Sequence, residues 1–134
     1  MELGQDRFLA HQKRASASQS LLEDARHLAA AQPRQPYSSE ATWETITKIF
    51  KGRMNGLTPY DWQMDVAEAL ILGLDCLVIA GTGAGKSMPF VMPLFAFPDK
   101  MVVIISPLNA LEEDQVSPSS SNGPKMLLTV WKGC

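Results

Sequence analysis

The chain has 134 residues, which is enough for one ordinary domain and too few for two full ones. Apolar residues make up 46% and charged residues 19%, a balance that excludes an intrinsically disordered chain. The net charge of −2 predicts no bulk attraction to nucleic acid or membranes, although it does not exclude a local nucleic-acid site. The apolar run at residues 77–80 is far shorter than the roughly 20 residues of a membrane span, so no membrane partner is expected.

The two cysteines, Cys76 and Cys134, are too few for a disulfide framework and lack the spacing of a metal site. Cys76 lies in an apolar run and is interpreted as a buried thiol, whereas Cys134 is interpreted as a free one. This usage favours a reducing compartment, the nucleus or the cytoplasm. Charged residues occupy the N-terminus where a signal peptide would be apolar, so secretion is not expected.

Residues 3–30 favour a helix, because they contain a single glycine, Gly4, and no proline. Their apolar face is thin, which leaves two short helices or a partly ordered arm as alternatives. Pro33 and Pro36 interrupt any helix and predict a linker near residues 32–39.

A second helix is predicted over residues 40–51, with Ser39 as its N-cap. Its apolar face combines Trp43, Ile46, Thr47 and Phe50. Residues 1–57 carry eight Lys and Arg against six Asp and Glu, whereas residues 58–134 carry four against eight. This shift predicts a boundary near Gly56, with a helical extension over residues 1–56 and a second unit over residues 57–134.

A third helix is predicted from Thr58 to Leu72, with Thr58 as its cap and Pro59 at its first position. Gly73 is suited to end it. Its expected buried residues share a helical spacing: Trp62, Val66, Ala69 and Leu70.

A strand–turn–helix–strand unit is predicted next. Residues 76–80 and 101–105 have the continuous apolar character of parallel strands buried on both faces, and a helix is expected over residues 86–95 between them. Pro89 is tolerated in the first turn of this helix, whereas Pro93 should kink or shorten it. Further along, the pattern favours a helix at residues 108–115, a loop at 117–124 and a short strand at 126–131.

The glycine-rich turn has the pattern of a phosphate-binding loop, Gly81-Thr82-Gly83-Ala84-Gly85-Lys86-Ser87, with Ala80 in place of the usual first glycine. Glycines allow backbone N–H groups to surround a polyphosphate. Lys86 is expected to reach the β- and γ-phosphates, and the Ser87 hydroxyl to coordinate magnesium. The expected cofactors are therefore ATP and Mg²⁺.

Residues 56–116 resemble the first RecA-like domain of superfamily-two helicases, and the RecQ branch most closely. Three segments carry the resemblance to the glutamine motif, motif I and motif Ia in order: LTPYDWQMDVAEALILGLD, AGTGAGKSMPFVMP and VIISPLNALEEDQV. The resemblance implies a partial RecA-like α/β domain, in which helices flank a parallel sheet, behind the N-terminal helical extension.

The resemblance also implies residue roles. Gln63 would pair its amide with the edge of adenine. Ser106, Pro107 and Leu108, at the carboxyl end of a strand, would face the DNA backbone. Asp114 and Gln115 also fit motif Ia.

The function implied is the ATP- and DNA-binding part of an ATP-dependent 3′–5′ DNA helicase. The sequence departs from the family in lacking a DExH motif and a second RecA-like domain. The alternative is therefore a non-enzymatic remnant that binds nucleotide or a partner, or has no function. No catalytic residue is assigned, and the chain alone is expected to sustain neither ATP hydrolysis nor unwinding. A small phosphate-loop kinase would leave the other two motifs unexplained.

Overall fold

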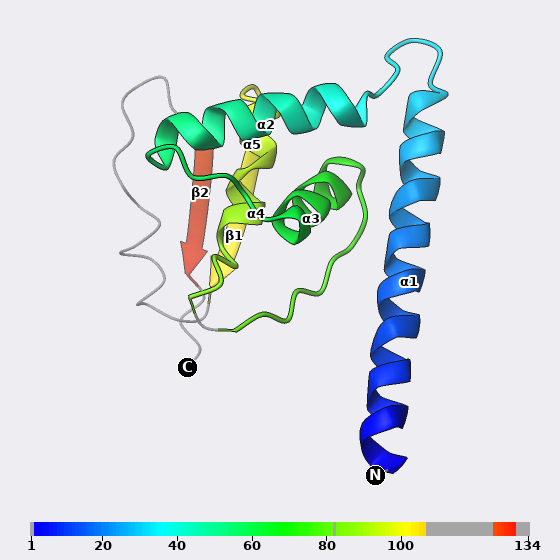
Figure 1. Ribbon diagram of the computed structural model, residues 1–134. Coiled ribbons are helices and arrows are strands. Elements are labelled where there is room, and N and C mark those ends of the chain that lie inside the picture. Colours follow the sequence, from blue (N-terminus) through cyan, green and yellow to red (C-terminus); the bar gives the residue numbers. More distant parts are fainter. Residues whose placement is uncertain (1, 82, 107–124, 131–134) are drawn as a thin grey trace.

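The computed structural model describes residues 2–81, 83–106 and 125–130, and this part of the chain is mostly helical (Figure 1). Its elements are, in order, α1 (Glu2–Ala30), α2 (Ser39–Arg53), α3 (Asp61–Ile71), α4 (Met88–Val91), α5 (Pro93–Ala96), β1 (Met101–Ser106) and β2 (Lys125–Val130). The long helix α1 lies along one side of the molecule, and α2 runs across one end of the group formed by α3, α4 and α5.

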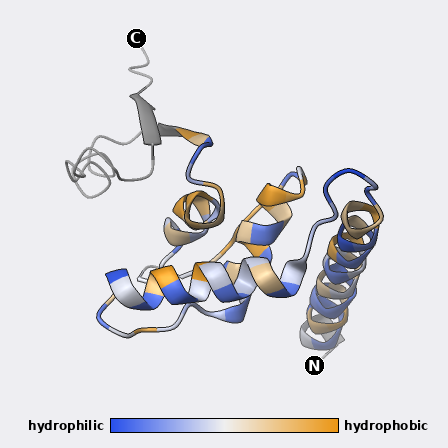
Figure 2. Ribbon diagram, turned by 90° about the horizontal axis from the view of Figure 1, so that it is seen from above, coloured by the Kyte–Doolittle hydropathy of each residue, from blue (hydrophilic) through white to orange (hydrophobic). Residues whose placement is uncertain are grey.

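The predicted N-terminal helix forms as one continuous helix of 29 residues, which excludes a break into two shorter helices. Residues 4–21 of α1 are exposed, and the first buried side chain is Leu22. Figure 2 shows hydrophilic and hydrophobic residues mixed along α1, which agrees with the thin apolar face expected from the sequence. Only the C-terminal part of this helix is therefore held by apolar packing.

The second helix begins one residue earlier than predicted. The N-cap is Ser38 rather than Ser39, and its Oγ accepts a hydrogen bond of 3.3 Å from the Ala41 N–H. The Ser39 hydroxyl instead donates to the Glu68 carboxylate. The apolar face is confirmed at Ile46 and Phe50, which are buried.

The hydrophobic core joins α2 to α3 and to the α4–α5 region. Its buried members are Ile46, Phe50, Met64, Ala67, Met92 and Phe95. These residues come from both sides of the predicted boundary near Gly56, although the division into two domains stays a prediction. The core fixes α3 between α2 and the segment that follows the phosphate loop.

The third helix differs from the prediction at its start and in its buried face. It begins at Asp61 after an extended Tyr60, so Pro59 lies outside the helix. It ends before Gly73, as expected, where φ is +80°. Of the four residues expected to be buried, only Ala69 is; Trp62, Val66 and Leu70 are half-buried. The buried positions of α3 are Gln63, Met64, Ala67, Glu68 and Ala69.

The strand expected at residues 76–80 does not form in this structure. Residues 74–80 run as an irregular segment, with the side chains of Leu77 and Ile79 about nine-tenths exposed, at 89% and 90%. Cys76 is exposed as well, so its assignment as a buried thiol was wrong. The physical reason is the lack of a pairing partner: within the described part of the chain, β1 pairs only with β2. An unpaired strand leaves its backbone groups without hydrogen bonds.

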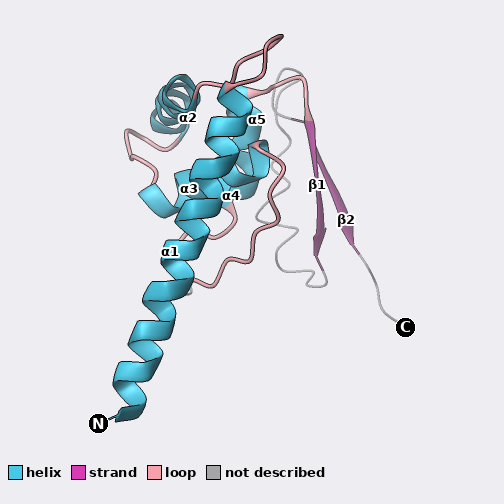
Figure 3. Cartoon of the chain, turned by 90° about the vertical axis from the view of Figure 1, so that its right-hand side faces the viewer, coloured by secondary structure: helices cyan, strands magenta, loops and turns pink. Residues whose placement is uncertain are grey.

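The helix predicted after the phosphate loop is divided into α4 and α5, in agreement with the expected effect of Pro93. Pro89 lies in the first turn of α4, and Pro93 begins α5. The strands predicted at residues 101–105 and 126–131 form as β1 and β2. They pair in parallel, from Met101 opposite Lys125 to Ser106 opposite Val130. Figure 3 shows this pair beside the helices. The larger sheet flanked by helices is not observed in the described residues, and the helix and loop expected at 108–124 fall outside them.

Candidate nucleotide site

The glycine-rich loop connects the irregular segment to α4 and has the backbone conformation that its glycines allow. Gly83 and Gly85 have φ angles of +79° and +73°, in the left-handed region that side chains disfavour. The Ala84 N–H donates to the Gly81 carbonyl at 3.2 Å, which closes a turn inside the loop. Thr82, also a predicted site residue, lies outside the described residues.

The amide groups of the loop are suited to hold an anion. The backbone N–H groups of Gly85, Lys86 and Ser87 donate to no group within the described residues. The Met88 N–H, one residue further along, bonds to the Gly85 carbonyl at 3.2 Å. Because α4 has only four residues, its helix dipole is small, and the loop amides themselves are the main donors.

The two charged and polar side chains of the motif lie at the same loop. The Lys86 ammonium reaches back over it and donates to the Ala80 carbonyl at 2.8 Å. Ser87 is the residue directly before α4, and its side chain makes no capping hydrogen bond. Lys86 is exposed and Ser87 half-buried. An ammonium donor, a hydroxyl oxygen and backbone N–H groups without a partner in the described part of the chain match the chemistry of a phosphate bound to magnesium.

Gln63 joins the first turn of α3 to the phosphate loop. Its Oε1 accepts from the Tyr60 N–H at 2.9 Å, and its Nε2 donates to the Gly85 carbonyl at 2.9 Å. The side chain is 3% exposed. Nε2 has two N–H groups and Oε1 has two lone pairs, and each of these bonds uses one of them. One N–H and one lone pair therefore remain for the edge of a base. The structure thus brings Gln63 and the loop together, as the motif order suggested.

The residues expected to face DNA are only partly described. Ser106 is the last residue of β1, whereas Pro107 and Leu108 lie outside the described residues, as do Asp114 and Gln115. The position of Ser106 at the carboxyl end of a strand agrees with the expectation. Its role toward DNA stays a prediction.

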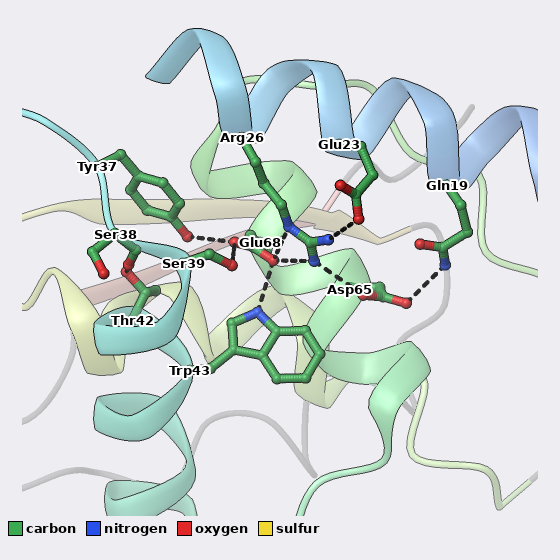
Figure 4. Close-up of polar contacts among 10 residues, drawn as sticks. All are labelled: Gln19, Glu23, Arg26, Tyr37, Ser38, Ser39, Thr42, Trp43, Asp65 and Glu68. Carbon is green, nitrogen blue, oxygen red and sulfur yellow. Dashed lines mark hydrogen bonds and ion pairs between the residues drawn. The ribbon is translucent and has the colours of Figure 1, made fainter. Parts of the chain in front are cut away.

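A buried polar cluster around Glu68 was missed by the sequence analysis (Figure 4). The Glu68 side chain is fully buried and accepts hydrogen bonds from three segments. Arg26 Nε in α1 donates to it at 2.9 Å, the Tyr37 hydroxyl in the linker at 2.9 Å, and the Trp43 Nε1 in α2 at 2.7 Å. The available signal was the helical spacing of Met64, Ala67, Glu68 and Ile71, which places an acidic residue within an apolar face.

The charges of this cluster follow from its contacts. Burial by itself would raise the pKa of the Glu68 carboxyl, but hydrogen bonds from Arg26, Ser39, Trp43 and Tyr37 outweigh it and hold the pKa below its ordinary value. Burial raises the pKa of Tyr37 to about 12, so its hydroxyl keeps the proton that it donates. Glu68 is therefore an ionised carboxylate in the interior at neutral pH.

Two further observations concern the described residues alone. No group of three or more His, Cys, Asp or Glu side chains there is arranged to hold a metal ion. No helix in the same residues has the length and apolar character that crossing a membrane requires.

Residues 60–130, more than half of the chain, match the family model of the DEAD/DEAH box helicases. The chain belongs to this helicase family. The matched region contains Gln63, the phosphate loop and both strands. No solved structure matches the chain.

The relatives of this DEAD/DEAH box protein include RecQ-type enzymes. The ATP-dependent DNA helicase Q-like SIM of Arabidopsis thaliana is 35% identical over 78 residues, covering 58% of the chain and 9% of that protein. The ATP-dependent DNA helicase RecQ of Pasteurella multocida is 41% identical over 61 residues, covering 46% and 10%. The ATP-dependent helicase wrn-1 of Caenorhabditis elegans is 32% identical over 98 residues, covering 66% and 9%. The chain is RecQ-like, and it spans about a tenth of the length of these relatives.

Gly85 offers a direct test of the loop geometry. A Cβ added at Gly85 would lie 2.6 Å from Gln63 Nε2, and the φ of +73° disfavours any side chain. We expect Gly85→Ala to destabilise the fold by about 2 kcal/mol, from backbone strain and the loss of the Gln63 hydrogen bond. Thermal or urea unfolding measures this change. The control is Gly81→Ala, because nothing lies within 4 Å of a Cβ there and its φ is not positive. Equal stability of the two variants would contradict the described loop.

Proposed function

We propose that this RecQ-like chain binds Mg²⁺–ATP at residues 81–87. The observation that carries the proposal is that one glycine-rich loop holds the Lys86 ammonium together with the backbone N–H groups of Gly85, Lys86 and Ser87, which donate to no group within the described residues. Family membership supports it, because the printed names of the relatives describe ATP-dependent helicases.

In this proposal the chain's own groups divide the work of binding. Gly81, Thr82, Gly83, Ala84 and Gly85 form the backbone that surrounds the phosphates. Lys86 exchanges its bond with the Ala80 carbonyl for one with a phosphate oxygen, which is a stronger, charge-assisted contact. The Ser87 hydroxyl supplies an oxygen ligand to magnesium, which neutralises phosphate charge when bound.

We propose that Gln63 recognises the adenine base through the N–H and the lone pair that its present bonds leave over. Because Gln63 is almost fully buried, the base edge reaches it only if a neighbour moves. The neighbour that we propose to move is Tyr60, which donates its backbone N–H to Gln63, directly precedes α3 and is 65% exposed. The bond from Gln63 to Gly85 would then connect base recognition with the phosphate loop.

We further propose that this protein shares the sheet, the DNA contacts and the unwinding activity of the RecQ-like helicases. The strands β1 and β2 would belong to a RecA-like parallel sheet flanked by helices, and Ser106, Pro107 and Leu108 would contact a DNA single strand or duplex junction. Unwinding in the 3′–5′ direction and its coupling to ATP hydrolysis are activities proposed for the whole protein. DNA-stimulated ATP turnover by the 134-residue chain, lost in Lys86→Ala, distinguishes an enzyme from a chain that only binds nucleotide.

Calorimetric titration with Mg²⁺–ATP and Mg²⁺–GTP tests the nucleotide site and the base contact together. The wild type is expected to bind both through the loop and to prefer ATP. Gln63→Ala should reduce this preference by about tenfold or less, the value of one or two neutral hydrogen bonds, while GTP affinity changes little.

The control for Gln63→Ala is Gln32→Ala, since Gln32 is an exposed glutamine in the linker. An unchanged preference for ATP in Gln63→Ala would remove the adenine role and leave phosphate binding intact. No binding of either nucleotide by the folded wild type would overturn the proposed function.

A further inference from the structure

The helix α3 contacts two different parts of the molecule through two of its side chains. Gln63, in its first turn, bonds to Gly85 of the phosphate loop. Glu68 bonds to residues of α1, the linker and α2. Five residues at 3.6 per turn separate these side chains by about 140° around the helix axis. The two contacts therefore lie on different faces, and α3 stands between the N-terminal helices and the nucleotide site.

Glu68 fixes the rotation of α3 more firmly than apolar packing alone does. An ionised carboxylate without exposure to water is stable only while its donors stay in place. Among the described residues the one charged donor to Glu68 is Arg26, whose Nη2 also contacts Asp65, one turn earlier on α3, at 3.4 Å. Arg26 thus holds two successive turns of α3. Apolar packing has no preferred direction, so it would define the rotation of α3 about its axis less sharply than these polar contacts do.

Rotation of α3 acts directly on the loop because Gln63 is its third residue. A hydrogen bond weakens steeply once its distance or angle departs from the optimum, and the bond from Gln63 Nε2 to the Gly85 carbonyl is 2.9 Å long. The same carbonyl accepts from the Met88 N–H, which starts α4. A small displacement of α3 therefore changes the support of the loop at Gly85, next to Lys86.

We propose that Arg26 and Glu68 form a positioning pair, through which the N-terminal helices hold Gln63 against the phosphate loop. Neither side chain touches nucleotide; both act through α3. This inference rests on the proposed function, because the consequence for binding requires that the loop take a nucleotide. In this view α1 and the start of α2 support the nucleotide site through α3 rather than forming an independent extension.

Nuclear magnetic resonance of the Gln63 side-chain amide in the full chain tests the positioning role without nucleotide. The variant is Arg26→Ala, and the control is Arg14→Ala, which removes an exposed arginine from the same helix. We expect Arg26→Ala to shift the Gln63 amide resonances toward those of a free glutamine and to speed their exchange with water. Arg14→Ala should leave both unchanged.

Binding measurements then test the consequence through a double-mutant cycle. Arg26→Ala is expected to weaken Mg²⁺–ATP binding by between about twofold and tenfold, the range of one net hydrogen bond. In a Gln63→Ala background the same change should have no further effect, because the affected bond is already absent. A purely structural role of Arg26 would give equal losses in both backgrounds.

The outcomes separate this inference from the proposed function. Unchanged Gln63 resonances in folded Arg26→Ala, or equal losses in both backgrounds, overturn the positioning pair. Shifted resonances in a protein that binds no nucleotide support the pair and overturn the proposed function. If Arg26→Ala does not fold, Tyr37→Phe replaces it, since this variant removes one donor to Glu68 and no charge. A smaller shift in the same direction supports the proposal, and no shift overturns it.

Discussion

Replacement of Lys86 by alanine is expected to weaken Mg²⁺–ATP binding by roughly 10- to 150-fold. The ammonium is the only charged side chain of the loop at residues 81–87, and a charge-assisted hydrogen bond contributes about 1.5–3 kcal/mol. Its present bond to the Ala80 carbonyl is exposed, so its loss should change the stability of the fold little. Isothermal titration calorimetry measures the affinity, and circular dichroism verifies that the variant is folded.

The control for this experiment is Lys100→Ala, which removes the same charge from an exposed position outside the loop. A general effect of net charge on an anionic ligand would weaken binding in both variants alike. The expected result is a loss confined to Lys86→Ala. Equal affinities of wild type and Lys86→Ala would show that the loop does not hold the phosphates.

Glu68→Gln is expected to lower the free energy of unfolding at pH 7 by about 3 kcal/mol. Neutralising Glu68 removes the buried partner of Arg26, which then keeps only its more exposed contacts with Asp65 and Glu23 among the described residues. The amide also presents N–H groups to a site that contains the donors Tyr37, Ser39 and Trp43. Urea unfolding at pH 7 measures the difference. The control is Glu23→Gln, which loses a contact with the same arginine from a side chain 59% exposed and should change stability by less than about 1 kcal/mol.

The same pair predicts how stability depends on pH. The pKa of Glu68 is lower in the folded chain than its ordinary value of 4.5, so the unfolded chain binds the proton more readily. The contribution of Glu68 is therefore complete above about pH 4.5 and is lost as the pH falls through the folded pKa. Arg26 stays charged throughout this range. Unfolding between pH 7 and pH 3 should show a steeper acid decline for wild type than for Glu68→Gln, and parallel curves would contradict the assignment.

Local signals predicted helices within residues 3–30, 40–51 and 58–72 and the strand at residues 101–105, because each depends on nearby residues. Pro93 separates α4 from α5, because it has no backbone N–H to continue the helical hydrogen bonds. Gly73, Gly83 and Gly85 have positive φ angles. The prediction of a strand at residues 76–80 was wrong, because a strand forms only where a partner strand lies beside it. Apolar composition alone shows that a segment is suited to a sheet, not that a neighbouring strand is present.

The Glu68 cluster shows why the rest of the site escaped prediction. Arg26 and Glu68 are 42 residues apart in sequence, and only the folded packing of α1 against α3 brings them together. The buried face of α3 was predicted from apolar residues, so Gln63 and Glu68 were not among the residues expected to be buried. Gln63 was found through a motif, whereas no motif marks Glu68.

The exposed apolar segment after α3 has a thermodynamic consequence for the whole chain. Leu77 and Ile79 are about as accessible to water as in an unfolded chain, and Met101 and Val103 are more than half exposed. Their hydration therefore changes little on unfolding and adds little to the heat-capacity increment, which is set by newly exposed apolar surface. The increment should fall below the usual value of about 12–15 cal/mol/K per residue. A small increment flattens the curve of stability against temperature, so cold denaturation of this protein should be displaced to a lower temperature.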